Sequence, residues 1–134
     1  MADIVKSGTP SLATSLPCHA HITDQGGDKR CGENVAAGDV VYVKASDGLV
    51  YRSIGTAANE AARAWGIAAR QANAGEPVTF YNNVEFHYGA SLVIGTPLYV
   101  GVAAGALADA PTTGGTRIIA HVVSATRIRF RGDL

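Results

Sequence analysis

Charged and aromatic residues are scarce in this chain of 134 residues. Asp, Glu, Lys and Arg make up 16% of it, and Phe, Trp and Tyr make up 7%. Eleven basic residues balance eleven acidic ones, so no overall field draws the chain to nucleic acid, and we expect none as a partner. No apolar run approaches the ~18 residues of a membrane-spanning helix, so we expect no membrane partner either. A surface rich in small uncharged residues is typical of a protein that partners cover.

Signals for export and for catalysis are also missing. The first seventeen residues contain no apolar segment of the signal-peptide kind, so we expect folding in a cytoplasm, where two cysteines stay as thiols unless oxidised later. No serine lies in a Gly-x-Ser-x-Gly turn, no carboxylates are paired locally, and no glycine-rich loop opens a helix. The sequence therefore predicts a protein that is not an enzyme and needs no cofactor.

From residue 35 onward the sequence has the pattern of strand and turn residues that is typical of an all-β protein. Short runs of Val, Ile and Tyr alternate with turn residues every eight to twelve positions, as in a small barrel or sandwich. Four hairpins are predicted within residues 40–53, 77–88, 96–109 and 116–132. Their expected turns are Ser46–Gly48, Asn82–Asn83, Ala104–Gly105 and Ser124–Ala125. We therefore expect a small β-barrel or β-sandwich of short antiparallel strands.

The alanine-rich segment 56–69 is the one helical candidate. Its alanines and Trp65 fall at helical spacing, and Thr56 is a suitable N-cap. We expect at most one short helix near residues 56–63, with a strand over 67–69.

A weak internal repeat links two of the hairpins. "GDVVYVKASDG" (38–48) and "GTPLYVGVAAG" (95–105) align without gaps and share four residues in eleven positions. "WGIAA" (65–69) and "RIIAH" (117–121) follow at similar places. The pattern predicts two similar units, although two unrelated hairpins with the same turn requirement would give the same matches.

The first 34 residues differ from the rest. They contain Ser, Thr, Pro and Gly but no sustained periodicity. We expect an extended N-terminal arm over residues 1–34 and a single β domain over residues 35–134.

The arm contains the stretch "PCHAHITDQGGDKRC", residues 17–31, with both cysteines of the chain. Cys18, His19, His21 and Cys31 are zinc-ligand types, but their spacing lacks the second closely spaced pair of a structural site. A metal site would need a fourth ligand such as His87, His121 or an acid. A disulfide between Cys18 and Cys31 and a pair of reduced thiols are the other two interpretations, and we expect no metal.

Two further patterns have both a functional and a structural interpretation. Arg127, Arg129 and Arg131 alternate on one face of the last strand, where they would contact an acidic partner or protect a sheet edge from pairing. Trp65, Tyr81, Phe86 and Tyr88 would line a ligand pocket or fill a core.

The blocks "AAGDVVYVKASDGLVYRS", "GTAANEAARAWGIAA", "GEPVTFYNNVEFHYGASLVIGTPLYV" and "GALADAPTTGGTRIIAHVVSATRIRF" occur in this order. Together they span roughly residues 33–131 and resemble the small capsid decoration, or cement, proteins of tailed bacteriophages. The resemblance lies in the pattern of glycines, turn residues and strand lengths.

The resemblance implies a structural virion protein without a cofactor. It would fold in the host cytoplasm and bind the outer capsid surface of the phage head, stabilising contacts between subunits of the major capsid protein. It also implies a homo-oligomer, most often a trimer. We expect the contacts with the capsid or between subunits to come from Ile4, Val5, Leu12, Leu16, His19, His21, Arg127, Arg129 and Arg131.

Three other functions stay open at this point. The chain would suit a small-molecule or carbohydrate-binding β-barrel displayed on a virion, with Trp65, Tyr81 and Tyr88 around the ligand. It would also suit the base domain of a head fibre. An enzyme using Cys18 and a histidine would need a thiol of lowered pKa.

Overall fold

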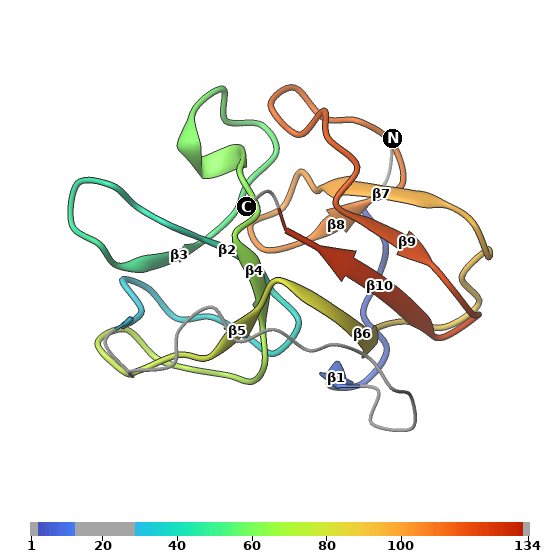
Figure 1. Ribbon diagram of the computed structural model, residues 1–134, viewed down its shortest axis with the longest axis horizontal. Helices are drawn as coiled ribbons and strands as arrows, with labels where there is room; N and C mark the ends of the chain where they lie inside the picture. Colours follow the sequence, from blue (N-terminus) through green and yellow to red (C-terminus); the bar gives the residue numbers. More distant parts are fainter. Residues whose placement is uncertain (1–2, 13–28, 133–134) are drawn as a thin grey trace.

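The chain forms an all-β protein of two antiparallel sheets, as expected. The computed structural model describes residues 3–12 and 29–132. The six-stranded sheet has the order β1-β6-β10-β9-β7-β8 and the four-stranded sheet the order β3-β2-β4-β5 (Figure 1). The strands do not close into a barrel. Their bounds are β1 Ser11–Leu12, β2 Val40–Val43, β3 Val50–Arg52, β4 Gly66–Ala68, β5 Phe80–Tyr81, β6 Asn83–His87, β7 Pro97–Val100, β8 Leu107–Ala108, β9 Ala120–Val122 and β10 Arg127–Arg131.

Three of the four predicted hairpins are confirmed. β2 pairs with β3, β7 with β8, and β9 with β10, each antiparallel across the expected turn. Two of these turns contain glycines with positive φ, Gly48 at 71° and Gly105 at 80°, a conformation that other residues adopt at a cost.

The predicted hairpin around Asn82–Asn83 is wrong. β5 pairs with β4 in the four-stranded sheet, whereas β6 pairs with β10 and β1 in the six-stranded sheet. The chain therefore passes from one sheet to the other at Asn82, whose carbonyl accepts a hydrogen bond from the Gly132 N–H at 2.9 Å. An Asn pair is equally suited to a tight turn and to a bend between strands, so composition alone could not separate them.

The helix of the 56–63 segment is a single 3₁₀ turn, Glu60–Ala62. Asn59, rather than the expected Thr56, caps it, because its side chain accepts a hydrogen bond from the Ala61 N–H at 2.9 Å. The expected strand after it is β4, one residue earlier than predicted.

Alternation of side chains along the strands builds two core clusters. In β6 and β10 every second residue is buried, so each offers an apolar face to the core and a polar face outward. β2 is buried on both faces: Val40 lies in the larger cluster with Leu98 and Phe130, and Val41 lies in the smaller one with Phe80. The four-stranded sheet is thus covered on both sides.

The internal repeat is present in the backbone. In both halves a hairpin is followed by a strand that pairs with its first member, giving the matching orders β3-β2-β4-β5 and β8-β7-β9-β10. Backbone hydrogen bonds also recur at equivalent positions of the two halves. In each pair of bonds, the residues in or before the two hairpins are 57 positions apart (95 minus 38). The pairs of N–H to C=O bonds are Val35→Ala72 with Leu92→Ala125, Gly38→Ala68 with Gly95→Val122, Trp65→Val41 with Ile119→Leu98, and Ala68→Asp39 with Val122→Thr96.

This correspondence extends the repeat upstream of the aligned hairpins. Gly32–Gly38 occupies the place of Gly89–Gly95, although only the two glycines at its ends match. The repeat therefore begins before residue 35, inside the expected arm. Described residues of that arm are bonded to the β domain by bridges Asp3–Ala108, Arg30–Pro77 and Cys31–Val50 and by β1.

The main-chain contact between the two halves gives the first prediction. A Cβ added to Gly55 would lie 2.2 Å from Thr112 Oγ1 and 2.4 Å from the Val100 carbonyl oxygen. We expect Gly55→Ala to lower the free energy of unfolding by about 3 kcal/mol, because the backbones must separate. Urea denaturation measures the loss. The matched variant Gly48→Ala has open space around the new Cβ and should lose only about 1 kcal/mol from its positive φ. Equal losses would contradict the role of close contact.

Candidate functional site

The N-terminal segment, residues 3–12, lies extended against the six-stranded sheet. Its backbone adds to both edges of that sheet: the Ile4 N–H donates to the Leu107 carbonyl at 2.8 Å, and β1 pairs with β6. Ile4 packs against the larger core cluster, whereas Val5 is 80% exposed. Leu12 pairs through its backbone with Phe86. Leu16, Cys18, His19 and His21 lie outside the described residues.

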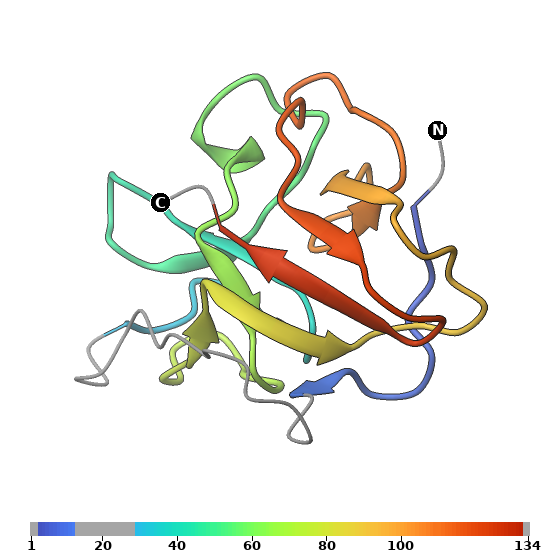
Figure 2. The same cartoon turned by 45° about the vertical axis from the view of Figure 1, so that its right-hand side comes forward.

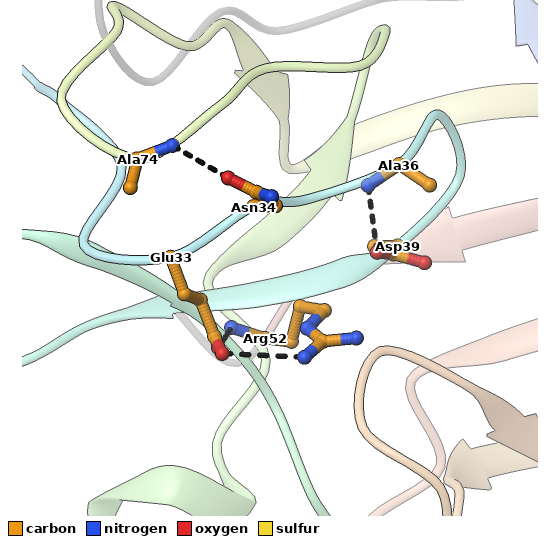
Figure 3. Close-up of polar contacts among 6 residues, drawn as sticks. All are labelled: Glu33, Asn34, Ala36, Asp39, Arg52 and Ala74. Carbon is orange, nitrogen blue, oxygen red and sulfur yellow. Dashed lines mark hydrogen bonds and ion pairs between the residues drawn. The ribbon is translucent and has the colours of Figure 1, made fainter.

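A partly buried ion pair anchors this segment. The Lys6 ammonium contacts Asp39 Oδ1, and the second carboxylate oxygen of Asp39 accepts a hydrogen bond from the Ala36 N–H at 2.8 Å (Figure 3). Burial, aided by the negative charge of Asp39, raises the pKa of the Tyr88 hydroxyl beyond its normal range, so this phenol stays neutral. Asp3 further fastens the segment by accepting hydrogen bonds from the Val102 and Ala103 N–H groups.

The segment 29–39 is fixed in a comparable way against the four-stranded sheet. The Arg52 guanidinium lies 3.3 Å from Glu33 Oε1, and the Ala74 N–H donates a hydrogen bond to Asn34 Oδ1 at 2.9 Å; Figure 3 draws both contacts. The arm expected from the sequence is therefore, in its described parts, hydrogen-bonded to the β domain along its length.

Exposed aliphatic side chains gather at one end of the six-stranded sheet. Val93 and Ile94 are 72% and 71% exposed, and Val123 is exposed as well. The loop between β6 and β7 lies beside the β9–β10 turn in both views (Figures 1 and 2). Hydrogen bonds from the Gly95 N–H to Val122 and from the Leu92 N–H to Ala125 hold it there.

Val5 passes beside the start of this loop but faces another part of the sheet. Its carbonyl oxygen lies 2.9 Å from the position of a Cβ built on Gly89, whereas the residue lines a hollow with Ala103 and Ala104 of the β7–β8 turn. We call Val93, Ile94 and Val123 the apolar end. No sequence signal marked these three, since they look like ordinary strand residues until the loop is placed.

The three arginines of β10 share the outer face of the six-stranded sheet, as predicted, but their surroundings differ. Arg127 and Arg129 lie 3.7 and 3.6 Å from the two carboxylate oxygens of Glu85, on the neighbouring strand β6. Arg129 also donates to Asn83 Oδ1 at 3.1 Å. Arg131 is exposed and has no ion-pair partner among residues 3–12 and 29–132. Glu85 thus neutralises part of the expected basic face, and Arg131 is the arginine of this face that has no described acidic partner.

The aromatic residues do not form a surface pocket. Tyr88 is 1% exposed and lies in the larger cluster, and Tyr81 packs edge-on against Phe86 with ring centres 6.5 Å apart. Trp65 packs against the smaller cluster. Their rings therefore serve mainly to fill the core.

Cys31 is a buried free thiol in the smaller cluster, 1% exposed. Burial, with smaller effects of Glu76 and Glu33, raises its pKa, so it has little thiolate character. The described part of the chain holds no group of three His, Cys, Asp or Glu side chains that could bind a metal. His87 and His121 lie exposed on the six-stranded sheet, away from Cys31, which packs on the four-stranded sheet. The Cys18–Cys31 disulfide stays a prediction, because Cys18 is not among the described residues.

No protein-family model, curated protein or solved structure matches this chain. The described residues also contain no helix long and apolar enough to cross a membrane. Function must therefore be argued from the surfaces themselves.

The Lys6–Asp39 pair gives the second prediction. Lys6→Ala leaves a buried carboxylate without its cation, and we expect the free energy of unfolding to fall by about 2 kcal/mol. Thermolysin should also cut within residues 3–12 faster than in the parent protein. Arg70→Ala, which removes an exposed cation, should leave both measurements unchanged within error. A stable Lys6→Ala protein with an unchanged cleavage rate would show that the pair does not hold the segment.

The Cys31 thiol gives the third prediction. In protein kept reduced, iodoacetamide should alkylate Cys31 at least on the order of tenfold more slowly in the folded state than in denaturant, because the thiol is buried and its pKa is raised. Peptide mass mapping of Cys31 after timed quenching measures the rates. Equal rates would contradict the burial.

The same protein purified without reductant tests the pairing with Cys18. An intact mass that rises by two hydrogens on reduction would establish the disulfide, and an unchanged mass would establish two thiols.

Proposed function

We propose that this protein is a structural virion protein: a capsid decoration protein that binds the outer surface of a tailed-phage head. It stabilises contacts between subunits of the major capsid protein. The observation that carries the proposal is the apolar end, three exposed aliphatic side chains brought together by the loop between β6 and β7 and the β9–β10 turn. The resemblance of residues 33–131 to decoration proteins supports the same function.

The apolar end has the composition of a protein contact. Burying one aliphatic side chain contributes ~1.5–3 kcal/mol, so three of them provide several kcal/mol before the cost of association. A capsid repeats each such contact many times, so a modest affinity per site is sufficient once subunits are linked. Backbone hydrogen bonds from Leu92 to Ala125 and from Gly95 to Val122 hold the loop in place, which reduces the ordering cost of binding.

The proposal includes a homo-oligomer, most often a trimer, on the outer capsid surface after folding in the host cytoplasm. Three linked copies would present three apolar ends to the shell, which multiplies the weak contact. It includes no cofactor, nucleic acid or membrane partner. A carbohydrate-binding alternative has less support, because Tyr88 and Tyr81 pack inward.

The fourth prediction tests attachment to the shell. Purified protein should co-sediment with expanded, undecorated heads built from the major capsid protein of the same genome, and it should raise their resistance to heat. The double variant Val93→Asp, Ile94→Asp should bind at least about tenfold more weakly, because two carboxylates replace buried aliphatic contacts. Val102→Asp is the matched control, since Val102 is exposed at the other end of β7.

Two results would count against the proposal. The first is a parent protein that neither sediments with the heads nor protects them. The second is a double variant that binds like the parent, which would move the contact away from the apolar end.

A further inference from the structure

Two adjoining hollows form one groove at the end of the six-stranded sheet where β9 begins and β10 ends. The first, of about 590 Å³, lies between the 3₁₀ turn and the loop 113–117. The second, of about 620 Å³, lies between that loop and the end of β10. They share Thr116, Arg117 and Ile119, so an extended chain could follow both.

Cationic side chains dominate the walls of this groove. Arg63 and Arg117 line the first hollow, and Arg117, Arg129 and Arg131 line the second. His121 is the cross-strand neighbour of Arg129. Among the described lining residues Glu60 is the one acid, and its Oε1 already accepts a hydrogen bond from the Ala45 N–H at 2.8 Å.

Acids pair with several cations of the described chain. Lys6 contacts Asp39, Arg52 contacts Glu33, and Glu85 contacts both Arg127 and the Arg129 of the groove. Arg63 and Arg131 are exposed, and no described carboxylate lies within ion-pair distance of either.

The groove also has an apolar part. Ile118 is 51% exposed in its lining, and Ile119 and Ala120 form buried surface beside it. A ligand that matches both features carries carboxylates together with aliphatic side chains, as an acidic peptide segment does.

Nucleic acid matches the groove less well. Single-stranded nucleic acid is bound by aromatic side chains that stack on bases, and the described residues that line the two hollows include no aromatic one. The chain as a whole is also neutral, so it lacks the broad positive field that collects phosphates.

We propose that this groove binds an extended acidic segment of a partner protein, with its carboxylates on Arg63, Arg117 and Arg131 and an aliphatic side chain against Ile118. The site is separate from the apolar end and goes beyond capsid attachment. The proposal can be tested without any capsid, because the binding depends only on the chemistry of the peptide.

The test uses a fluorescein-labelled hexapeptide, Asp-Glu-Leu-Asp-Glu-Leu, and the purified full chain. Fluorescence anisotropy at low ionic strength should show saturable binding that weakens steeply as salt is added. The matching hexapeptide with Asn and Gln in place of Asp and Glu should bind at least about tenfold more weakly. The charge-reversed variant Arg117→Glu, Arg131→Glu should lose at least about tenfold in affinity for the acidic peptide.

Arg70→Glu is the matched control, because it reverses one exposed charge outside the groove; it should stay within about twofold of the parent. Urea denaturation of each variant shows that the fold is retained, and Arg131→Gln alone, a milder change, should weaken binding in the same direction. Absence of saturable binding by the parent would overturn the proposal. So would equal losses in the groove and control variants, or tighter binding of a single-stranded oligonucleotide than of the acidic peptide.

Discussion

The structure depends on one constraint: its two halves meet through main-chain hydrogen bonds at glycines. The Gly55 N–H donates to the Gly101 carbonyl at 2.7 Å, and the Gly105 N–H donates to the Ser53 carbonyl at 2.7 Å. A Cβ on Gly105 would lie 2.7 Å from Asp39 Cγ, and a Cβ on Gly101 would lie 2.6 Å from Asp3 Oδ1. This approach brings β2 of one sheet close to the β7–β8 hairpin of the other, so Val40 can share a core with Leu98. The abundance of glycine in the chain is therefore a packing requirement as well as a turn requirement.

Pseudo-symmetry explains why so few strands suffice. Each half contains a hairpin and two further strands in the same order, and neither half alone could bury both faces of its sheet. Joined, they enclose the larger cluster between them, and the N-terminal segment and residues 29–35 cover what is left. Asp39 makes two such contacts at once. Its carboxylate accepts a hydrogen bond from the Ala36 N–H in a local turn and also contacts Lys6 of the N-terminal segment.

The sequence was sufficient for the fold class, three hairpins and the repeat, because these depend on local alternation and turn residues. It was insufficient where the answer depended on distant partners. Asn82 bends between sheets instead of closing a hairpin because β10 competes for β6. Lys6 and Asp39 are 33 positions apart, and nothing in either neighbourhood indicates the other. Arg127, Arg129 and Arg131 were recognised by alternation, yet the sequence could not show that Glu85 would lie opposite two of them. Arg63 and Arg117 were missed because the groove unites segments with no common motif.

The apolar end and the groove differ in the kind of interaction they offer, and they lie at opposite ends of the β9–β10 hairpin. The apolar end includes the β9–β10 turn, and the groove includes the start of β9 and the end of β10, so they are separated by roughly 15 Å, the length of a five-residue strand. A contact at the apolar end would be non-directional and insensitive to salt, whereas a contact in the groove would be oriented by guanidinium groups and would weaken with salt. A protein with both on one hairpin can hold two partner segments at a fixed spacing, with one contact supplying affinity and the other orientation.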